Sequence, residues 1–316
     1  MSEGKTIKYL DLFSGYGGFS LGIQQAINAE CVGFSEIDLF AIETYQKHFP
    51  KHQSYGDITK IKAEELPEID LLVGGFPCQA FSIAGKRRGF SETRGTLIFD
   101  VLRILEAKRP ARVLLENVKG LLSHDGGRTF RTIITSLAEL GYAVEWQVLN
   151  AKNFGVPQNR ERVFIVGHLG GFGGRQVFPI GCDGTIYPEQ KPSQSSCLKS
   201  DAQRIYSPEG IGKTLKGLGG GQGAKTGLYA IHQRARGKND GGSKDLCPTI
   251  TGKSFQDNNH LVAGTKIRRL TPTECERLMG LPDGWTTGHS DTQRYKLCGN
   301  GVVVDVVREV IRKMYA

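Results

Sequence analysis

Short apolar runs alternate with longer amphipathic ones through the first 170 residues, and this alternation limits the possible folds more than any other feature of the chain. The apolar runs have the length and residue types of buried strands. They lie at 7–13, 30–36, 69–75, 111–117, 142–149 and 162–168. Helix-like stretches separate them at 18–28, 38–48, 96–108 and 127–140. Such alternation predicts an α/β fold, with a doubly wound, mostly parallel sheet that carries helices on both faces.

The pattern changes near residue 170. Residues 170–227 contain 14 glycines, and a polar run follows at 234–245. Glycine-rich stretches without periodicity are typical of loops. We therefore predict a separate, loop-rich and mainly β region over residues 170–265, with little helix.

Helical order returns after this region. Thr271 is placed to cap a helix, with Pro272 at the first helical position and Glu274 completing a capping box. The closing stretch 302–315 predicts a final helix despite its β-branched start.

Composition narrows the class of protein. A chain of 316 residues can hold one large or two modest domains, and it contains neither an apolar run of membrane-spanning length nor a signal core. The seven cysteines are an odd number with no CxxC pair, which argues against a zinc site or a disulfide framework. We expect an intracellular protein with reduced thiols and no metal.

The net charge is +9, and the excess is concentrated. Residues 199–257 hold ten Lys and Arg against five Asp and Glu. A concentrated basic excess favours a polyanionic partner, although an ordinary solvated surface would have the same composition.

A glycine-rich loop follows the first strand. Gly15, Gly17 and Gly18 stand where ligands bind in doubly wound sheets, against backbone N–H groups at a helix start. A dinucleotide fingerprint needs a third glycine or alanine, and Ser20 stands there instead. A tight strand–helix turn is the simpler reading, but it accounts for one glycine better than for three.

Two acidic residues suit an adenosine-containing cofactor. Glu36 ends the second strand, where a carboxylate can accept from ribose hydroxyls, and Asp57 follows a predicted third strand, where it can accept from an adenine amino group. S-adenosylmethionine (AdoMet) fits better than NAD, because it has no pyrophosphate and its sulfonium favours acidic or aromatic neighbours.

Cys78 lies in "GGFPCQAFS" (74–82), directly after an apolar strand. Free cysteine is among the most buried residue types, so a core thiol is the common case. The glycines and Pro77 also suit a turn that presents a reactive thiol at a strand end. This motif alone leaves both readings open.

Six motifs in one order carry a resemblance to a known family. They are "DLFSGYGG" (11–18), "GGFPCQAFS", "ENV" (116–118), "QNRER" (158–162), "RRLTPTECERLMGLPD" (268–283) and "YKLCGNGV" (295–302). Together they resemble the ordered motif set of the DNA (cytosine-5)-methyltransferases of the bacterial HhaI type. Residues 204–229 are similar to the target-recognition segment of that type.

The resemblance implies an AdoMet-binding, Rossmann-like catalytic domain at 1–180 and 288–316, and a small target-recognition domain with a hinge at 181–287. Double-stranded DNA is the implied partner, bound by a monomer. The protein would be cytoplasmic, prokaryotic and nucleoid-associated or viral within a host, and would belong to a restriction–modification system or act as an orphan methylase.

The implied reaction is methylation of cytosine C5 after the base has flipped out of the duplex. A thiolate adds to C6 and later leaves, which is the expected task of Cys78. Glu116 would neutralise charge at N3, and Arg162 would lie beside it. From the residues alone, Glu116 could equally be a strand-end carboxylate that pairs with Lys119.

The motif 158–162 is interpreted as a strand, on which Gln158, Arg160 and Arg162 would share one face. The resemblance also assigns binding residues. The AdoMet pocket is expected to contain Phe13, Gly15, Gly17, Gly18, Glu36, Ile37, Asp57, Ile58, Pro77, Leu97 and Asn300. The expected DNA contacts are Gln79, Lys86, Arg87, Arg88, Arg160, Arg204, Thr214, Gly219 and Gly220.

The chain departs from the HhaI type in several places. Ala84 and Gly301 stand where serines are common, and Asp201 stands where a glutamine fills the space left by the flipped base. Residues 230–265 are longer than the corresponding segment, so the recognised sequence is open.

Three rival functions are weighed. A tRNA cytosine-5 methyltransferase of the same fold would share the chemistry, but the long basic glycine-rich region favours duplex DNA. A catalytically inactive DNA-binding regulator is disfavoured by the presence of Cys78, Glu116 and Arg162 together. A nicotinamide oxidoreductase is disfavoured by Ser20.

Overall fold

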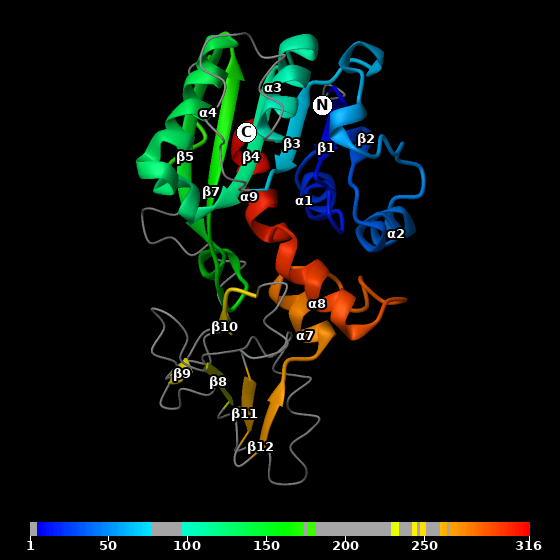
Figure 1. The fold of residues 1–316 in the computed structure, drawn as a ribbon, viewed down its shortest axis with the longest axis vertical. Coiled ribbons are helices and arrows are strands. Elements are labelled where there is room, and N and C mark those ends of the chain that lie inside the picture. The colour runs from blue at the N-terminus through cyan, green and yellow to red at the C-terminus, as the bar shows by residue number, and fades with distance from the viewer. Residues whose placement is uncertain are drawn as a thin grey trace. The chain divides into compact units, whose positions relative to one another are not determined.

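The computed structural model describes residues 5–77, 97–173, 176–180, 229–233, 242–244, 247–250, 260–263 and 266–316 (Figure 1). The chain divides into two compact units, each described by itself below. The first comprises Met1–Leu149, Glu161–Ile180 and Val307–Ala316. The second comprises Asn150–Arg160 and Gly181–Val306.

A six-stranded sheet in the order β2-β1-β3-β4-β7-β5 organises the first unit. Its strands are β1 (Ile7–Leu12), β2 (Ala29–Ser35), β3 (Leu71–Gly75), β4 (Arg112–Val118), β5 (Tyr142–Asn150) and β7 (Glu161–Leu169). The helices between them are α1 (Gly18–Ala26), α2 (Leu39–His48), α3 (Leu97–Lys108) and α4 (Arg128–Glu139). The predicted strand–helix alternation over these residues is confirmed.

Both faces of this sheet are covered. On one face Leu10 and Leu12 of β1 share an apolar core with side chains of α3 and α4, which lie in front of the sheet in Figure 1. The opposite face carries Tyr9 and Asp11, against residues of α1 and α2. Side chains of a strand alternate between faces, so a buried strand must be apolar nearly throughout. This requirement explains why the strands read as continuous apolar runs.

The strand order creates a switch point between β1 and β3. The chain moves outward from β1 to β2 and then returns to pair β3 with the other side of β1. Gly74 allows β3 to lie close to β1, since a Cβ there would stand 3.0 Å from the Leu12 carbonyl oxygen. Ligands of doubly wound sheets bind at the carboxyl ends of the strands beside such a point.

One strand of the sheet runs against strands β1 to β4. β7 pairs with β4 in antiparallel register, with Glu116 opposite Phe164 and Val118 opposite Arg162. The amino end of β7 therefore lies at the edge of the sheet where the parallel strands have their carboxyl ends.

The described part of the second unit contains two small sheets and three helices. One sheet pairs β6 (Gln158–Asn159) with β10 (Cys247–Pro248); the other has the order β12-β11-β8-β9. The strands of the latter are β8 (Tyr229–Gln233), β9 (Gly242–Lys244), β11 (His260–Ala263) and β12 (Lys266–Arg269). The helices are α7 (Pro272–Leu278), α8 (Asp291–Asn300) and the start of α9 (Val304–Tyr315), whose later residues belong to the first unit.

The predicted start of α7 is confirmed in detail. The Thr271 hydroxyl accepts from the Glu274 N–H, and the Glu274 carboxylate accepts from the Thr271 N–H at 2.7 Å. Because Pro272 has no N–H group, this helix start leaves three open N–H groups, and the capping box satisfies two of them.

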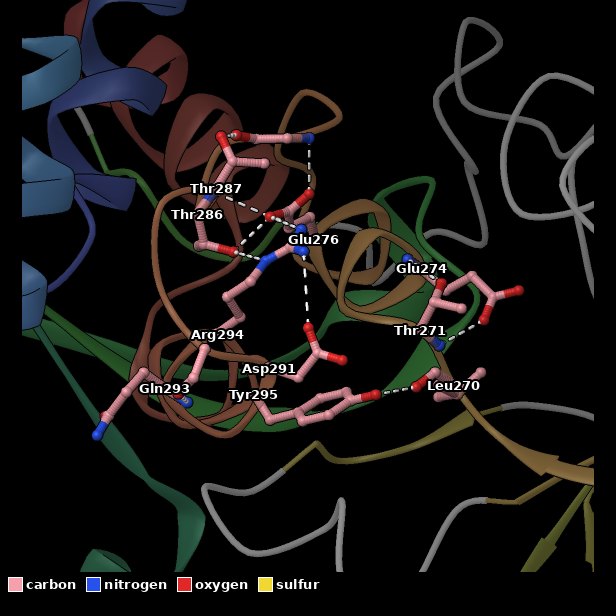
Figure 2. Close-up of polar contacts among 12 residues, drawn as sticks. Leu270, Thr271, Glu274, Glu276, Thr286, Thr287, Asp291, Gln293, Arg294 and Tyr295 are labelled. Atoms are coloured by element: carbon pink, nitrogen blue, oxygen red, sulfur yellow. Dashed lines mark hydrogen bonds and ion pairs between the residues drawn. The ribbon is translucent and has the colours of Figure 1, made fainter.

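A buried carboxylate joins α7, α8 and the loop between them (Figure 2). Glu276 is fully buried, and it accepts from the N–H groups of Gly284 (2.7 Å) and Thr286 (2.9 Å) and from the Thr286 hydroxyl. The Arg294 guanidinium lies 2.9 Å from the same carboxylate and also donates to the Thr286 hydroxyl. This network fixes the shape of the loop at 279–290.

Two local predictions are wrong. The motif 158–162 does not form one strand, because β6 ends at Asn159 and β7 begins at Glu161, so its alternate residues share no face. Asp57 does not follow a third strand: Ser54 forms only an isolated bridge with Phe34, and Asp57 caps the 3₁₀ helix Ile58–Lys60.

Candidate active site

Four chain segments meet at the carboxyl edge of the sheet. The loop after β1, the turn after β3 and the ends of β2 and β4 all leave the sheet there, since these strands are parallel. Antiparallel β7 adds its first residues to the same edge. The order of the strands thus gathers residues that lie far apart in the sequence.

Glu116 and Arg162 form an ion pair at this edge. Arg162 Nε lies 3.0 Å from Glu116 Oε1, and the two side chains are 15% and 12% exposed. The register makes the two residues diagonal neighbours on adjacent strands, a separation that long side chains span. Burial lowers the pKa of the Arg162 guanidinium, and the Glu116 carboxylate partly offsets this.

The alternative pairing of Glu116 with Lys119 does not occur. Lys119 Nζ instead lies 2.9 Å from Glu161 Oε2, in an exposed pair. Glu116 is therefore paired with the Arg162 guanidinium and not with Lys119.

Gly75 and Asn117 connect this pair to the end of β3. Gly75 is the Cα partner of Glu116, and a Cβ on it would stand 3.3 Å from Glu116 Oε2. The buried Asn117 donates from Nδ2 to the Phe76 carbonyl (2.8 Å) and accepts from the Val118 N–H (2.8 Å). The backbone at Phe76, just past the end of β3, is thus joined to the residue beside Glu116.

Sequence reasoning placed Asn117 inside a motif but gave it no role. Its position in an otherwise apolar strand could have indicated a role, because a polar side chain that is buried there needs a hydrogen-bond partner. The partner itself could not be read from the sequence, because Phe76 is 41 positions away.

The glycine-rich loop adopts backbone conformations that side chains rarely take. Gly15 has φ 55° and Gly17 has φ 91°, and Gly17 is the N-cap of α1. Phe13, which directly follows β1, also has a positive φ of 54°. A non-glycine residue in this region costs about 1 kcal/mol or more, and such strain is concentrated at ligand sites.

Glu36 holds the loop in place. Its Oε2 accepts from the Gly15 N–H at 2.9 Å, and its Oε1 accepts from the N–H groups of Ile37 (2.8 Å) and Asp38 (2.9 Å). A single carboxylate therefore links the loop after β1 to the turn after β2.

The surroundings of Glu36 and Asp57 suit an adenosine group. A Cβ built on Gly15 or on Gly56 meets nothing within 4 Å, so both glycines border open space. Ile37 is 70% exposed beside the Glu36 carboxylate, an apolar surface that a flat ring could cover. Hydrogen bonds from the Thr59 N–H and hydroxyl lower the pKa of Asp57, which keeps it an anionic acceptor.

The remaining predicted cofactor residues differ in their exposure and in the unit to which they belong. Phe13 and Leu97 are partly buried at the border of the core, Pro77 is exposed, and Ile58 is buried within the core. Asn300 is the last residue of α8 in the second unit, so its place in an AdoMet site stays a prediction.

Arg160 is not positioned as a phosphate contact. Its side chain is buried at 2% exposure, with Nη1 donating to the Ile250 carbonyl (2.8 Å) and Nη2 to those of Gly299 (3.2 Å) and Gly301 (2.7 Å). A phosphate would have to displace these acceptors. In this structure Arg160 joins three segments of the second unit, and the DNA contact expected of it stays a prediction.

A buried polar cluster under the glycine-rich loop was also missed. Asp11 is fully buried, and its Oδ2 accepts from the Ser20 hydroxyl at 2.7 Å. The Ser20 hydroxyl is 2.7 Å from that of Tyr45, which in turn is 3.0 Å from His52 Nδ1. Burial raises the pKa of Asp11 to about 7, and the hydrogen bonds from Ser20 oppose this rise.

The described cysteines do not suit nucleophilic chemistry. Cys247, Cys275 and Cys298 are buried free thiols, and Cys31 is half-buried. Burial raises the pKa of the Cys31 thiol to about 12 and raises the pKa of the other three as well. A reactive thiolate needs the opposite shift.

Several predicted residues lie outside the described residues. They are Cys78, Gln79, Lys86, Arg87, Arg88, Arg204, Thr214, Gly219 and Gly220. Within the described ranges, no group of three or more His, Cys, Asp or Glu side chains is arranged to hold a metal ion. No helix in the same ranges has the length and apolar character needed to cross a membrane.

Comparison with known proteins defines the class of enzyme. Residues 7–316 match the family described as C-5 cytosine-specific DNA methylase. The chain belongs to this family and is a DNA (cytosine-5)-methyltransferase.

Two bacterial relatives span nearly the whole chain. Type II methyltransferase M1.ScrFI of Lactococcus lactis subsp. cremoris is 40% identical, over 98% of this chain and 79% of its own length. Type II methyltransferase M.HhaI of Haemophilus parahaemolyticus is 34% identical, over 96% of this chain and 93% of its own length. The predicted resemblance to the HhaI type is confirmed.

A solved structure supports the fold. The S. pombe Dnmt2 methyltransferase has a TM-score of 0.68 and 21% sequence identity, with 98% of both chains covered. At this identity the likeness shows the fold alone, which is the α/β architecture predicted from the alternating pattern.

Proposed function

We propose that the chain transfers a methyl group from AdoMet to carbon 5 of a cytosine in a short, specific site of duplex DNA, through a covalent bond between Cys78 and cytosine C6. The 3.0 Å pair of Arg162 Nε and Glu116 Oε1 is the observation that carries the proposal. It places a carboxyl group beside the strand end from which the chain continues to Cys78.

The chemistry explains the need for a thiol. Cytosine C5 is a poor nucleophile, so a thiolate first adds to C6 and moves electron density to C5. AdoMet, when bound, supplies the methyl group that C5 attacks. Water then takes the C5 proton, and the electrons of the C5–H bond form the C5–C6 double bond. The thiolate leaves with the electrons of the C–S bond, which restores the aromatic ring. Cys78 supplies this thiolate, as the resemblance of "GGFPCQAFS" to the family motif implies, and burial raises the pKa of the four described thiols, which disfavours them as nucleophiles.

Glu116 acts on the base at N3. Negative charge develops on the pyrimidine ring when the thiolate adds, and a carboxyl proton directed at N3 neutralises it. The Arg162 guanidinium fixes the orientation of this carboxyl through Oε1. Gly75 leaves room for Oε2, because a side chain there would press against it.

The loop after β1 and the turn after β2 hold the cofactor. The Glu36 carboxylate accepts from ribose hydroxyls, and Phe13, Ile37 and Asp57 surround the adenine. Gly15, Gly17 and Gly18 permit the loop to follow the methionine portion, with Ile58, Pro77, Leu97 and Asn300 completing the pocket. Open space beside Gly15 and Gly56 supports this placement.

DNA binding completes the proposal. The target cytosine must leave the duplex, because its C6 atom is inaccessible within the stack, at a cost of a few kcal/mol. Residues 1–180 and 288–316 form the catalytic domain and 181–287 the recognition domain. The contacts come from Gln79, Lys86, Arg87, Arg88, Arg204, Thr214, Gly219 and Gly220, and a monomer suffices. Type II relatives favour a place in a restriction–modification system, in the cytoplasm.

The first experiment maps the product. The gene is expressed with a plasmid in a host that lacks cytosine methylation, and the plasmid is sequenced for 5-methylcytosine. We expect modification at one short sequence. Methylation of purified tRNA instead of the plasmid would support the RNA alternative and overturn the proposal.

The second experiment tests the covalent step. A duplex that carries 5-fluorocytosine at the mapped site should form an adduct that survives denaturation, because fluorine cannot leave as a proton does. Peptide mapping should place the adduct on Cys78, and Cys78→Ala should form none. An adduct on another cysteine, or full activity of Cys78→Ala, would contradict the mechanism.

A further inference from the structure

The Asn117 side chain extends the connection between β4 and the end of β3 beyond their backbone pairing. The backbone pairing of the two strands ends where Gly75 faces Glu116. Pro77 has no N–H group, so the hydrogen-bond ladder cannot continue through it. The Asn117 carboxamide supplies the next connection, from Nδ2 to the Phe76 carbonyl at 2.8 Å.

The orientation of this carboxamide is determined by its partners. Its Oδ1 accepts from the Val118 N–H at 2.8 Å, and a carbonyl oxygen receives Nδ2. The reversed amide would set two donors against each other and two acceptors against each other. Asn117 is 2% exposed, so water does not compete for either bond.

The same strand end carries the acid. Glu116 is the neighbour of Asn117, and its Oε2 borders Gly75, the residue before Phe76. Two adjacent residues of β4 therefore hold the carboxyl group and the backbone after β3: Glu116 carries the carboxyl, and Asn117 binds the Phe76 carbonyl. A shift of Phe76 relative to Asn117 would change the position of the following residues relative to Glu116.

We propose that Asn117 is a positioning residue for methyl transfer: by holding the Phe76 carbonyl, it fixes the backbone two residues before Cys78 relative to the Glu116 carboxyl. The inference rests on the proposed function, because it assumes that Cys78 is the nucleophile. Asn117 itself contacts neither the base nor the methyl donor in this role.

Substitution by aspartate separates positioning from folding. Asn117→Asp keeps the shape and the acceptor for the Val118 N–H, but the ionised side chain has no donor for the Phe76 carbonyl. When protonated, the same carboxyl regains an O–H donor. Asn117→Ala lacks the donor at every pH. Asn28→Asp is a matched control, since Asn28 is exposed and its amide nitrogen donates to the Thr6 hydroxyl.

The measurement is the rate of adduct formation with a 5-fluorocytosine duplex under single-turnover conditions, from pH 5.5 to 8.5, as a ratio to the wild-type rate. We expect Asn117→Asp to be about 10- to 100-fold slower at pH 8 and to recover toward wild type as the pH falls. Asn117→Ala should be slow throughout, and Asn28→Asp should match wild type. AdoMet affinity, measured by calorimetry, should stay within twofold in all three.

Each other outcome has one meaning. Wild-type trapping rates in both Asn117 variants would overturn the inference while leaving the proposed function intact. A loss of AdoMet binding that parallels the loss of rate would assign Asn117 a role in folding alone and would also overturn it. Failure of the wild-type enzyme to form any adduct would instead contradict the proposed function.

Discussion

Glu116 with Arg162 in the first unit and Glu276 with Arg294 in the second are both buried carboxylate–guanidinium pairs, yet their surroundings differ. Glu276 is fully buried, and its two oxygens receive two backbone N–H groups, a hydroxyl and the guanidinium (Figure 2). All these donors belong to one helix–loop–helix segment. This pair maintains the shape of a loop.

Glu116 lies instead at a strand end, where a glycine keeps space beside its second oxygen. Its partner comes from an antiparallel strand, and the Arg162 side chain retains 15% exposure. A carboxylate that must act on a substrate needs an accessible edge, whereas one that maintains a loop needs every lone pair occupied. We therefore expect the same substitution to lower mainly the rate of methyl transfer at Glu116 and mainly the free energy of unfolding at Glu276.

Glu116→Gln should have the largest effect, and on catalysis. Glutamine can still accept from Arg162, but it has no acidic proton to direct at N3. We expect single-turnover methyl transfer to fall by about 10²- to 10⁴-fold. AdoMet affinity should be unchanged, and a collapse of cofactor binding would show that the carboxyl is structural.

Glu276→Gln should act mainly on stability. Removal of one member of a buried pair leaves the other charge uncompensated, which typically costs about 3–5 kcal/mol. We expect a loss of about 3 kcal/mol in urea unfolding, near the lower end of that range because Asp291 remains 4.0 Å from Arg294. The fraction that stays folded should methylate DNA at the wild-type rate. Equal stability of the two Gln variants would remove the proposed distinction.

Asp11 offers a third, smaller test, because this buried carboxylate has a hydroxyl partner where the other two have an arginine. Its pKa is about 7 in the folded protein, against 3.8 for the ordinary side chain. The unfolded chain therefore releases this proton first, and the stability from this group is present at low pH and lost as the pH rises through 7.

The measurable quantity is the difference in unfolding free energy between Asp11→Asn and wild type. Between pH 5 and pH 8 it should change by about 2.5 kcal/mol in favour of the variant, since asparagine does not titrate. Other titrating groups cancel in the difference. A difference that is flat with pH would mean that Asp11 is ionised throughout.

The strand–helix pattern predicted most of the first unit because local and tertiary requirements agree there. Strands buried on both faces must be apolar, so the runs at 7–13 and 111–117 could be recognised without knowledge of their partners. The capping box at Thr271 is equally local, as all its donors and acceptors lie within four residues. The motif order identified the family for a different reason, since it depends on spacing alone.

The two arginines of the motif 158–162 show where such reading fails. They are two positions apart and chemically identical, and strand alternation would treat them alike. The end of β6 at Asn159 breaks that equivalence. Arg160 then turns to three carbonyl groups of the second unit, and Arg162 turns to Glu116.

By itself the sequence determined the element order, the glycine-rich loop, the capped helix and the family, because these depend on side-chain periodicity and on motifs read in chain order. Only the tertiary structure decided which residues meet. The antiparallel direction of β7 is the main case, since a parallel β7 would carry Arg162 to the opposite edge of the sheet, one strand length from Glu116. Strand direction depends on how the crossover packs, and no local pattern in residues 142–169 records it.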